Sequence, residues 1–215
     1  MRNKDLFIAS ALEELLPDAK CALDFSSPFQ CLVAVSLSAQ TTDVAVNRVT
    51  PALFSSFPDA FAMADAPLEE VKNLIRSIGL YDHKAKNIIA LSKKLVESFG
   101  GQVPQTREEL TTLPGVGVKT ANVVLAECFG VPAIAVDTHV SRVAFRLGYC
   151  KQGEDPIRIE QILEKRFPKE MWIKLHHRII WFGRLVCHAK KPECEKCPLQ
   201  SVCVYFKKAS SKTGR

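Results

Sequence analysis

The chain is predicted to turn back on itself at the sequence LPGVGVKTA, residues 113–121. Helical patterns precede and follow this stretch, so its Pro-Gly-Val-Gly turn predicts a helix–hairpin–helix. Glycine permits positive φ angles and leaves no Cβ between backbone N–H groups and an approaching anion, and the second helix would point its N-terminus at that anion. We therefore predict that Gly115, Val116 and Gly117 contact a phosphodiester without regard to base sequence. The alternative is an ordinary glycine-rich connector.

The remainder of the chain also reads as helices separated by Gly and Pro. A helix is expected to open at Asp82, a capping box begins another at Thr106, and Asp155-Pro156 precedes a further one. Residues 29–37 are almost continuously apolar, which predicts a fully buried helix. Strand-like alternation is nowhere sustained, so the predicted fold class is all-α.

Four cysteines lie near the C-terminus with the spacing C-x6-C-x2-C-x5-C. Thiols so close together in sequence can meet at one point, and such a cage holds iron–sulfur or zinc. Structural zinc usually takes paired C-x2-C knuckles, and only one such pair is present. The four candidate ligands are Cys187, Cys194, Cys197 and Cys203. The amphipathic N-terminus is a candidate packing partner for this segment.

Positive charge is concentrated in the same segment. From Cys187 to the end of the chain there are seven basic and two acidic residues, which gives +5 of the total net charge of +6. The cage would fix Lys190 and Lys191 in place. Fixed cations beside a rigid loop suit a polyanion such as nucleic acid.

Lys119 follows the hairpin in the first turn of the second predicted helix. A cation is disfavoured at a helix N-terminus, and partial burial would disfavour it further, so both effects favour the neutral amine. A neutral amine is a nucleophile that can attack a sugar carbon and form a Schiff base. The residues alone leave this role and that of an ordinary ammonium on a phosphate equally open.

A candidate partner carboxylate lies 18 residues further on, in the sequence VDTHV at residues 136–140. Asp137 stands where a helix begins, which predicts an N-cap whose carboxylate accepts backbone N–H bonds. The same carboxylate could face one cleft with Lys119, stabilise an oxocarbenium-like sugar and activate the nucleophile. Both roles can hold together. His139 could line a pocket or be a satisfied helix histidine.

Taken together, these segments resemble endonuclease III, a bifunctional DNA glycosylase and AP lyase. The hairpin, Lys119, the sequence VDTH and the cysteine spacing all match that family. Two further stretches agree: LSAQTTD at residues 37–43 and GLYDHKA at residues 79–85. The combination is far more specific than the hairpin alone, which occurs in many DNA-binding proteins.

The resemblance implies a two-lobed helix-hairpin-helix DNA glycosylase fold. Residues 22–132 would form a six-helix barrel lobe that contains the helix–hairpin–helix at about 106–128. Residues 1–21 and 133–215 would form a discontinuous iron–sulfur cluster lobe. The four cysteines would then hold a [4Fe-4S] cluster.

The resemblance also implies residue roles and a reaction. Lys119 would be the nucleophile and Asp137 its carboxylate partner, while Gln40 and Leu80 fall where family members fill the gap left by an everted nucleotide. Attack at C1′ would displace an oxidised pyrimidine, and β-elimination would cut the abasic strand, as in base excision repair. His139, Lys190 and Lys191 complete the expected DNA contacts. The expected partner is double-stranded DNA with damaged pyrimidines or abasic sites, bound by a monomer.

Three other interpretations remain open at the level of sequence. Adenine-removing relatives typically lack the lysine and carry Glu three residues before the Leu that matches Leu37, whereas here that position is Ala34. Pyrimidine-dimer glycosylases share most of the motifs. A non-catalytic DNA-binding module stabilised by zinc belongs to a different class of function.

The N-terminal residues predict the cellular compartment. They lead into an amphipathic stretch rather than an apolar signal core, and no apolar run approaches the roughly 18 residues that a membrane helix requires. We therefore expect a cytoplasmic protein, nucleoid-associated in a prokaryote, that is neither secreted nor bound to a membrane.

Overall fold

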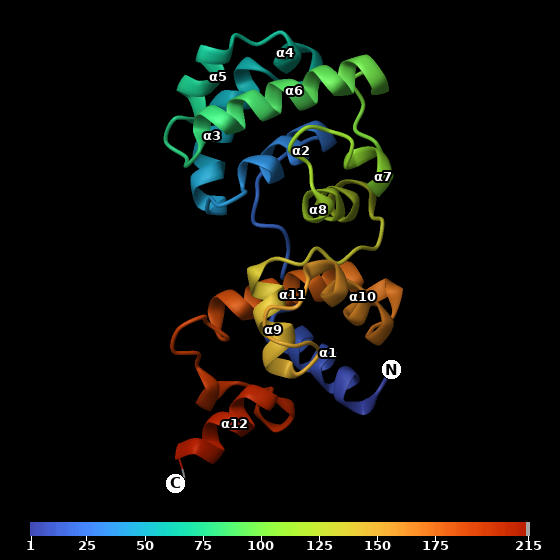
Figure 1. The fold of residues 1–215 in the computed structure, drawn as a ribbon, viewed down its shortest axis with the longest axis vertical. Coiled ribbons are helices and arrows are strands. Elements are labelled where there is room, and N and C mark those ends of the chain that lie inside the picture. The colour runs from blue at the N-terminus through green and yellow to red at the C-terminus, as the bar shows by residue number, and fades with distance from the viewer. Residues whose placement is uncertain (214–215) are drawn as a thin grey trace. The chain divides into compact units, whose positions relative to one another are not determined.

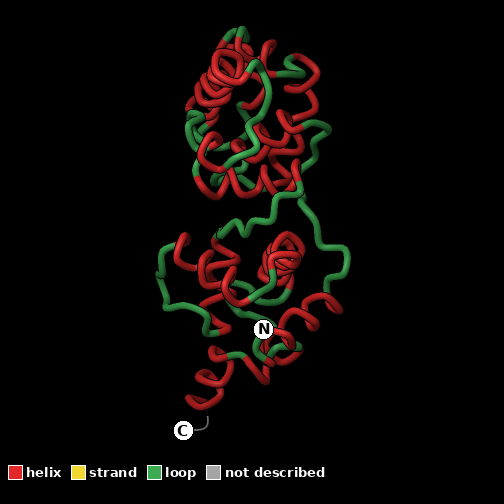
Figure 2. The backbone as a smooth tube through the Cα atoms, turned by 90° about the vertical axis from the view of Figure 1, so that its right-hand side faces the viewer, coloured by secondary structure: helices red, strands yellow, loops and turns green. Residues whose placement is uncertain are grey.

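The structure is a computed structural model that describes residues 1–213, so residues 214 and 215 of the predicted iron–sulfur lobe lie outside the described residues. Every regular element in the described chain is a helix (Figures 1 and 2), which confirms the all-α prediction. The α-helices are α1 (Asn3–Leu15), α2 (Pro28–Leu37), α3 (Asp43–Ser56), α4 (Ala60–Ala64), α5 (Leu68–Ile75), α6 (Tyr81–Phe99), α7 (Arg107–Leu110), α8 (Val118–Phe129), α9 (Thr138–Leu147), α10 (Pro156–Arg166), α11 (Trp172–Leu185) and α12 (Val204–Thr213). The 3₁₀-helices are η1 (Lys169–Met171), η2 (Cys194–Lys196) and η3 (Gln200–Val202).

The chain divides into two compact units. Unit 1 combines Met1–Lys20 with Pro132–Arg215 and contains α1 and α9 to α12. Unit 2 is Cys21–Val131 and contains α2 to α8. The candidate residues are therefore distributed over both units, with Gln40, Leu80 and Lys119 in unit 2 and Asp137 and the four clustered cysteines in unit 1.

Helix α2 is the centre of unit 2. Ser27 caps it by accepting a hydrogen bond from Gln30 N at 3.2 Å, and Pro28 occupies its first turn, where no N–H is needed. Its middle residues, Cys31 to Ala34, are 0 % exposed, because α8, α3 and α6 pack around it. The predicted buried helix at residues 29–37 is confirmed, and it fixes the loop that follows Leu37.

Helix α6 begins one residue earlier than the sequence indicates. Leu80, in the left-handed conformation with φ of 58°, takes the N-cap position, and Asp82 lies inside the first turn. The expectation that Asp82 opens the helix is therefore wrong. Its carboxylate binds lysines instead, with Oδ1 2.7 Å from Lys72 Nζ and Oδ2 2.8 Å from Lys86 Nζ.

Unit 1 has its own apolar core, built where α9 packs against α10, α11 and α12 and α1 packs against α11. Ile8 and Leu12 of α1 share this core with Leu199 and Cys203 of the cysteine segment. The N-terminal stretch is thus the predicted packing partner of that segment, although its Leu6 remains 53 % exposed. Among the described residues, no helix combines the length and apolar character needed to span a bilayer.

Candidate functional site

The turn between α7 and α8 is compact. Val116 N donates to Leu113 O at 3.1 Å, and both side chains are buried. Gly115 has φ of +77°, and a Cβ at this position would lie 2.9 Å from Asn87 Nδ2 of α6. The left-handed backbone conformation and the close approach of Asn87 therefore both favour glycine at position 115. The Val116 N–H is already paired within the turn, so it is not free to bind a phosphate.

Gly117 serves a different purpose. It is the N-cap of α8 with an ordinary φ of −93°, so the expected positive φ is not found there. A Cβ at Gly117 would meet nothing within 4 Å, and no side chain caps the helix. The first backbone N–H groups of a helix have no intrahelical partner. The start of α8 is thus an open, uncapped helix N-terminus of the kind that binds anions.

Lys119 is the second residue of α8. Its side chain is exposed, and no hydrogen bond or ion pair to it is seen within the part of the chain that the structure describes. The predicted position in the first helical turn is confirmed. The expected partial burial is wrong, because the hairpin holds the start of α8 at the surface of its unit.

Asp137 is the N-cap of α9, as predicted. Its Oδ1 accepts a hydrogen bond from Val140 N at 2.8 Å. The preceding apolar residues, Ala133 to Val136, are buried and lead the chain to this point. Across residues 1–213 no hydrogen bond to the other carboxylate oxygen is seen, so one oxygen serves the helix and the second is available to a ligand.

His139 lies in the first turn of α9 and is held by its neighbours. Its Nδ1 is 3.0 Å from Arg142 Nη2, and the same nitrogen of Arg142 donates to Gly183 O at 2.7 Å. Burial lowers the pKa of His139, with Asp137 acting in the opposite direction. A Cβ at Gly183 would lie 3.0 Å from His139 Cβ, so glycine lets α11 approach α9 closely. This packing favours a satisfied helix histidine.

Three predicted DNA-contact residues share an unusual backbone. Gln40, Leu80 and Lys191 have φ angles of 54°, 58° and 50°. They are the non-glycine residues with positive φ in the described chain, and all three are exposed. The left-handed region is rarely occupied by such residues and persists only where the surrounding structure holds it. Sequence patterns gave no signal for this conformation.

The four clustered cysteines line one cavity in unit 1 together with Leu147, Phe182 and Leu199. Leu199 N lies 3.4 Å from Cys197 Sγ and Phe206 N lies 3.5 Å from Cys203 Sγ, so backbone N–H groups donate to two of the sulfurs. Burial raises the pKa of the Cys197 thiol, and the Leu199 N–H opposes this. Such N–H donors stabilise thiolate, the form that binds metal.

The chemistry of these four cysteines bears on what they can hold. All four contribute to the lining of a single cavity. Four cysteine thiolates are the usual ligand set of a [4Fe-4S] cluster, so the residues present fit that group.

Arg146, which sequence analysis did not single out, organises the cysteine segment. This buried residue of α9 donates from Nη1 to Cys187 Sγ at 3.2 Å and to His188 O at 2.7 Å, and from Nη2 to Ala189 O at 3.1 Å. A guanidinium group with several forked donors suits such a task. The sequence signal that could have identified Arg146 is its position four residues after Arg142, on the helix that Asp137 caps.

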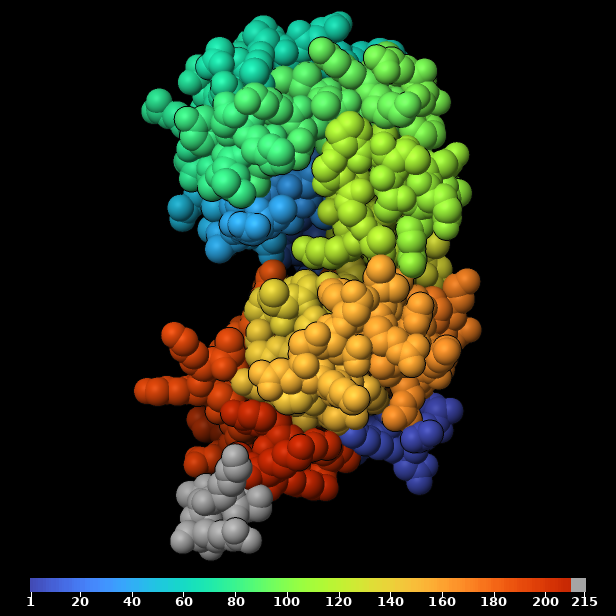
Figure 3. Space-filling model, in the orientation of Figure 1, coloured from blue at the N-terminus to red at the C-terminus, as the bar shows by residue number. Residues whose placement is uncertain are grey.

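Lys190 and Lys191 follow directly after the carbonyl groups that Arg146 binds. Both side chains are exposed. Figure 3 shows side chains of the segment between α11 and α12 extending from the surface of unit 1. Arg146 anchors the segment on one side of the two lysines, and Glu193 N donates to Val186 O at 3.0 Å on the other side.

Comparison with known proteins identifies the family. The model of HhH-GPD superfamily base excision DNA repair proteins matches residues 33–169, and that of the iron–sulfur binding domain of endonuclease III matches residues 187–203. Endonuclease III of Bacillus subtilis is 51 % identical over 197 residues, 92 % of this chain and 90 % of its own length. Endonuclease III of Escherichia coli K12 is 45 % identical over 207 residues, 96 % and 98 % of the two chains.

Solved structures agree with these matches. A trapped endonuclease III–DNA covalent intermediate is 47 % identical with a TM-score of 0.92, over 98 % of this chain and 100 % of that one. A thermostable thymine-DNA glycosylase, 24 % identical, shares the fold with a TM-score of 0.87 over 95 % of this chain and 97 % of that one. The iron–sulfur match begins at Cys187 and ends at Cys203, so the cofactor is a [4Fe-4S] cluster. The chain belongs to the endonuclease III family of base excision DNA repair proteins.

Proposed function

We propose that this protein removes oxidised pyrimidines from duplex DNA and then cuts the abasic strand, with Lys119 as the nucleophile. As a member of the endonuclease III family, it is a DNA glycosylase and AP lyase of base excision repair. The observation that carries the Lys119 assignment is an exposed amine in the first turn of α8, next to an uncapped helix N-terminus.

The proposed reaction has two covalent stages. Neutral Lys119 Nζ attacks C1′, the C1′–N bond breaks, and the base leaves with the bonding electrons and takes up a proton. The amine loses a proton and the sugar ring opens at O4′, which leaves a Schiff base. Removal of a C2′ proton then expels the 3′ phosphate oxygen in a β-elimination, which cuts the strand on its 3′ side. Water finally hydrolyses the Schiff base and releases Lys119.

Asp137 is proposed to stabilise the positive charge that develops on the sugar in the first stage. A carboxylate placed where charge develops lowers the barrier electrostatically. The N-cap bond from Val140 supports this role, because it fixes the carboxylate through Oδ1 and leaves Oδ2 for the sugar.

The remaining contacts divide between phosphate and the base stack. We propose that the N-terminus of α8, Lys190 and Lys191 bind phosphate groups, which would orient the duplex without reading its sequence. Gln40 and Leu80 would fill the space left by the everted nucleotide. We expect a monomer to act on duplex DNA that carries a damaged pyrimidine or an abasic site.

Borohydride reduction tests the nucleophile, since only a Schiff base becomes a permanent crosslink. We expect the unmodified protein to crosslink to a duplex with an abasic site, and Lys119→Gln to abolish crosslinking while it retains affinity for the same duplex. Lys93→Gln is the matched control, because Lys93 is an exposed lysine of unit 2 outside the hairpin. Crosslinking that survives in Lys119→Gln would assign the nucleophile to another residue.

A panel of duplexes, each with one lesion, tests the substrate class. We expect base release from oxidised pyrimidines and none from cyclobutane pyrimidine dimers or from adenine opposite oxidised guanine. Release from either of those two substrates alone would replace the proposed substrate class with the corresponding alternative.

We propose that the [4Fe-4S] cluster has a structural role and is held by Cys187, Cys194, Cys197 and Cys203. Cys197→Ser should lose visible absorbance, unfold unit 1 at lower temperature and weaken duplex binding together, because the ligands also order the segment with Lys190 and Lys191. Cys150→Ser, a half-buried cysteine of unit 1 outside the set, is the control. Lost absorbance with unchanged unfolding temperature and affinity would contradict a structural role.

A further inference from the structure

Lys84 connects the two loops that carry Gln40 and Leu80. It lies in the first turn of α6 with 5 % of its surface exposed, and its Nζ donates a hydrogen bond to Thr41 Oγ1. Thr41 directly follows Gln40 in the chain. The backbone N–H of Lys84 also donates to Leu80 O at 3.0 Å. One residue is therefore bonded to both loops, which are 40 residues apart in sequence.

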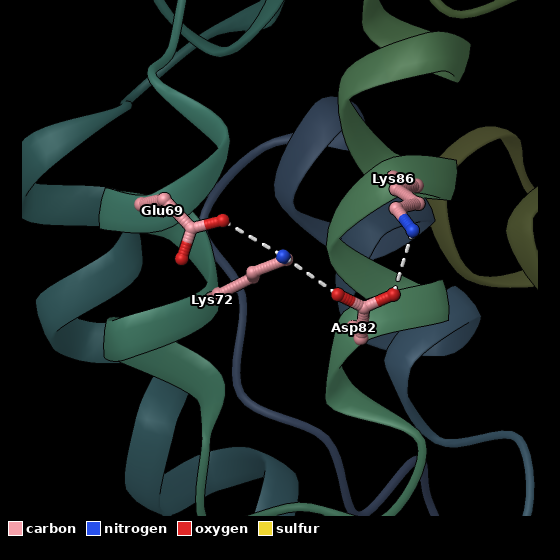
Figure 4. A network of polar contacts seen from close by, with 4 residues as sticks. All are labelled: Glu69, Lys72, Asp82 and Lys86. Carbon is pink, nitrogen blue, oxygen red and sulfur yellow. Dashed lines mark hydrogen bonds and ion pairs between the residues drawn. The ribbon is translucent and has the colours of Figure 1, made fainter.

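The environment of Lys84 is unfavourable for an ammonium group. Burial lowers its pKa, and the first turn of a helix disfavours positive charge. The nearest acidic residue in sequence, Asp82, uses its oxygens for Lys72 and Lys86, as Figure 4 shows. In the described structure the hydroxyl of Thr41 is the side-chain partner of Lys84. A buried lysine without a carboxylate partner destabilises a fold, so its presence points to a role beyond packing.

Both loops are also held in a conformation that needs support. Gln40 and Leu80 have φ angles of 54° and 58°, in the left-handed region, and Leu80 is 60 % exposed. An exposed leucine cannot be held there by its own burial. The bonds from Lys84 act at Leu80 O and at Thr41, which places them beside both strained residues.

We propose that the Lys84–Thr41 hydrogen bond is a positioning device that fixes the two loops relative to each other, so that Gln40 and Leu80 enter the vacated stack together. The inference rests on the proposed function, since it assigns a task to residues that only a flipped nucleotide requires. Lys84 touches neither substrate nor reacting atoms in this scheme. It acts through the two residues it positions.

Two substrates separate positioning from chemistry. A single-stranded oligonucleotide with an abasic site has no base stack to fill, whereas a duplex with the same site does. For Lys84→Met and for Thr41→Val we expect kcat/KM on the duplex to fall roughly tenfold to hundredfold, the range that small misplacements produce. Strand cutting on the single-stranded substrate should stay within about twofold, since Lys119 is untouched. Thr41→Ser, which keeps the hydroxyl, should restore most of the duplex rate.

The double variant and a spectroscopic readout test the mechanism further. If Lys84 and Thr41 act through one hydrogen bond, the duplex rate of the double variant should match that of either single variant rather than the product of both losses. A 2-aminopurine base beside the abasic site should fluoresce less on binding to Lys84→Met than to the unmodified protein, because fewer duplexes are held in the unstacked state.

Lys86→Met is the matched control, because it removes a cation from the same helix two residues away without touching either loop. Equal duplex rates for Lys84→Met and the unmodified protein would overturn the proposal. So would a loss of equal size on both substrates, which would indicate general damage to the site.

Salt dependence tests whether Lys84 contacts phosphate instead. If the slope of log affinity against log salt concentration became shallower by about one for Lys84→Met, Lys84 would be a phosphate contact. If Lys84→Met does not fold, Thr41→Val decides. An unmodified protein inactive on both substrates would refute the proposed function rather than this inference.

Discussion

Helices α8 and α9 both begin at residues proposed for the chemistry, but they treat their first backbone N–H groups differently. Helix α8 starts at Gly117, whose missing side chain leaves those groups uncovered, and carries Lys119 in the same turn. Helix α9 starts at Asp137, whose carboxylate accepts the Val140 N–H over 2.8 Å. One start is open to an anion, and the other supplies an anion of its own.

Under the proposed function, this difference would assign two tasks to the two helix starts, phosphate binding and charge stabilisation. An uncovered helix N-terminus attracts phosphate. A helix start capped by aspartate carries a carboxylate, which can stabilise positive charge at a sugar. Exchanging the two caps would lose both properties, so substitutions at Asp137 and Gly117 test the comparison directly.

The largest effect is expected from Asp137→Asn. Asparagine caps a helix about as well as aspartate, so the free energy of unfolding should change by only a few tenths of a kcal/mol. Base release should nevertheless fall roughly 10²- to 10³-fold, because the charge that stabilises the sugar cation is gone. Single-turnover kinetics on a lesion-containing duplex, together with thermal unfolding, measures both quantities.

A second aspartate cap supplies the control for that experiment. Asp155 begins α10 and accepts hydrogen bonds from Ile157 N and Arg158 N, so Asp155→Asn makes the same chemical change at a helix start with no proposed role. Its base-release rate should equal that of the unmodified protein. An Asp137→Asn variant as fast as Asp155→Asn would reduce Asp137 to a helix cap.

An intermediate effect is expected at the two hairpin glycines, which should differ in their effect on stability. Gly117→Ala has room and an ordinary φ, so the lower entropy of the unfolded chain should offset the poorer N-cap, and the free energy of unfolding should change by less than about 1 kcal/mol. Its affinity for a duplex with a tetrahydrofuran abasic analogue should still fall about tenfold, since a methyl group now stands before the N–H groups. Fluorescence anisotropy gives the affinity.

Gly115→Ala is the counterpart. Its φ of +77° and the contact with Asn87 should lower the free energy of unfolding by roughly 1–2 kcal/mol. Any loss of affinity should follow from that destabilisation. If Gly117→Ala bound the analogue as tightly as the unmodified protein, the open start of α8 would have no role in binding phosphate.

The smallest effect concerns a third helix start, that of α6, which holds a buried cation. Burial lowers the pKa of Lys84 below the ordinary 10.5, so the unfolded chain binds more protons than the folded one between the lowered value and 10.5. Stability contributed at this residue should therefore rise with pH across that window. Chemical denaturation at several alkaline pH values should show that the free energy of unfolding of the unmodified protein rises relative to that of Lys84→Met as the pH increases. A constant difference would mean that Lys84 titrates normally.

Much of the fold was predictable because strong local signals agree with the tertiary structure. The apolar run of α2, the capping box at Thr106, and the glycines that end α8 and α9 all act where the sequence indicates. Helix α3 was not predicted, and Pro51, which usually ends or kinks a helix, lies inside it. The prediction that Asp82 opens α6 was wrong, because its carboxylate forms ion pairs with lysines from two helices instead of capping the helix.

Residue type and spacing in the sequence were enough to propose the cysteines, Lys119 and Asp137 as site residues, and they remain proposals. Features of the candidate site that depend on packing were not predictable. The exposure of Lys119, the contacts of Arg146 with the cysteine segment and the bond between Lys84 and Thr41 depend on residues brought together from distant parts of the chain. No local pattern reports such contacts.

The interrupted path of the chain through unit 1 has a consequence for how the protein matures. Unit 2 is a single continuous stretch, so it can fold on the ribosome while later residues are still being made. Helix α1 is translated before unit 2, yet its buried face must wait for α11 and the core around it, which are translated after unit 2. We expect nascent chains to pass through a stage in which α1 is exposed to chaperones, and iron to be delivered only after Cys203 has been translated.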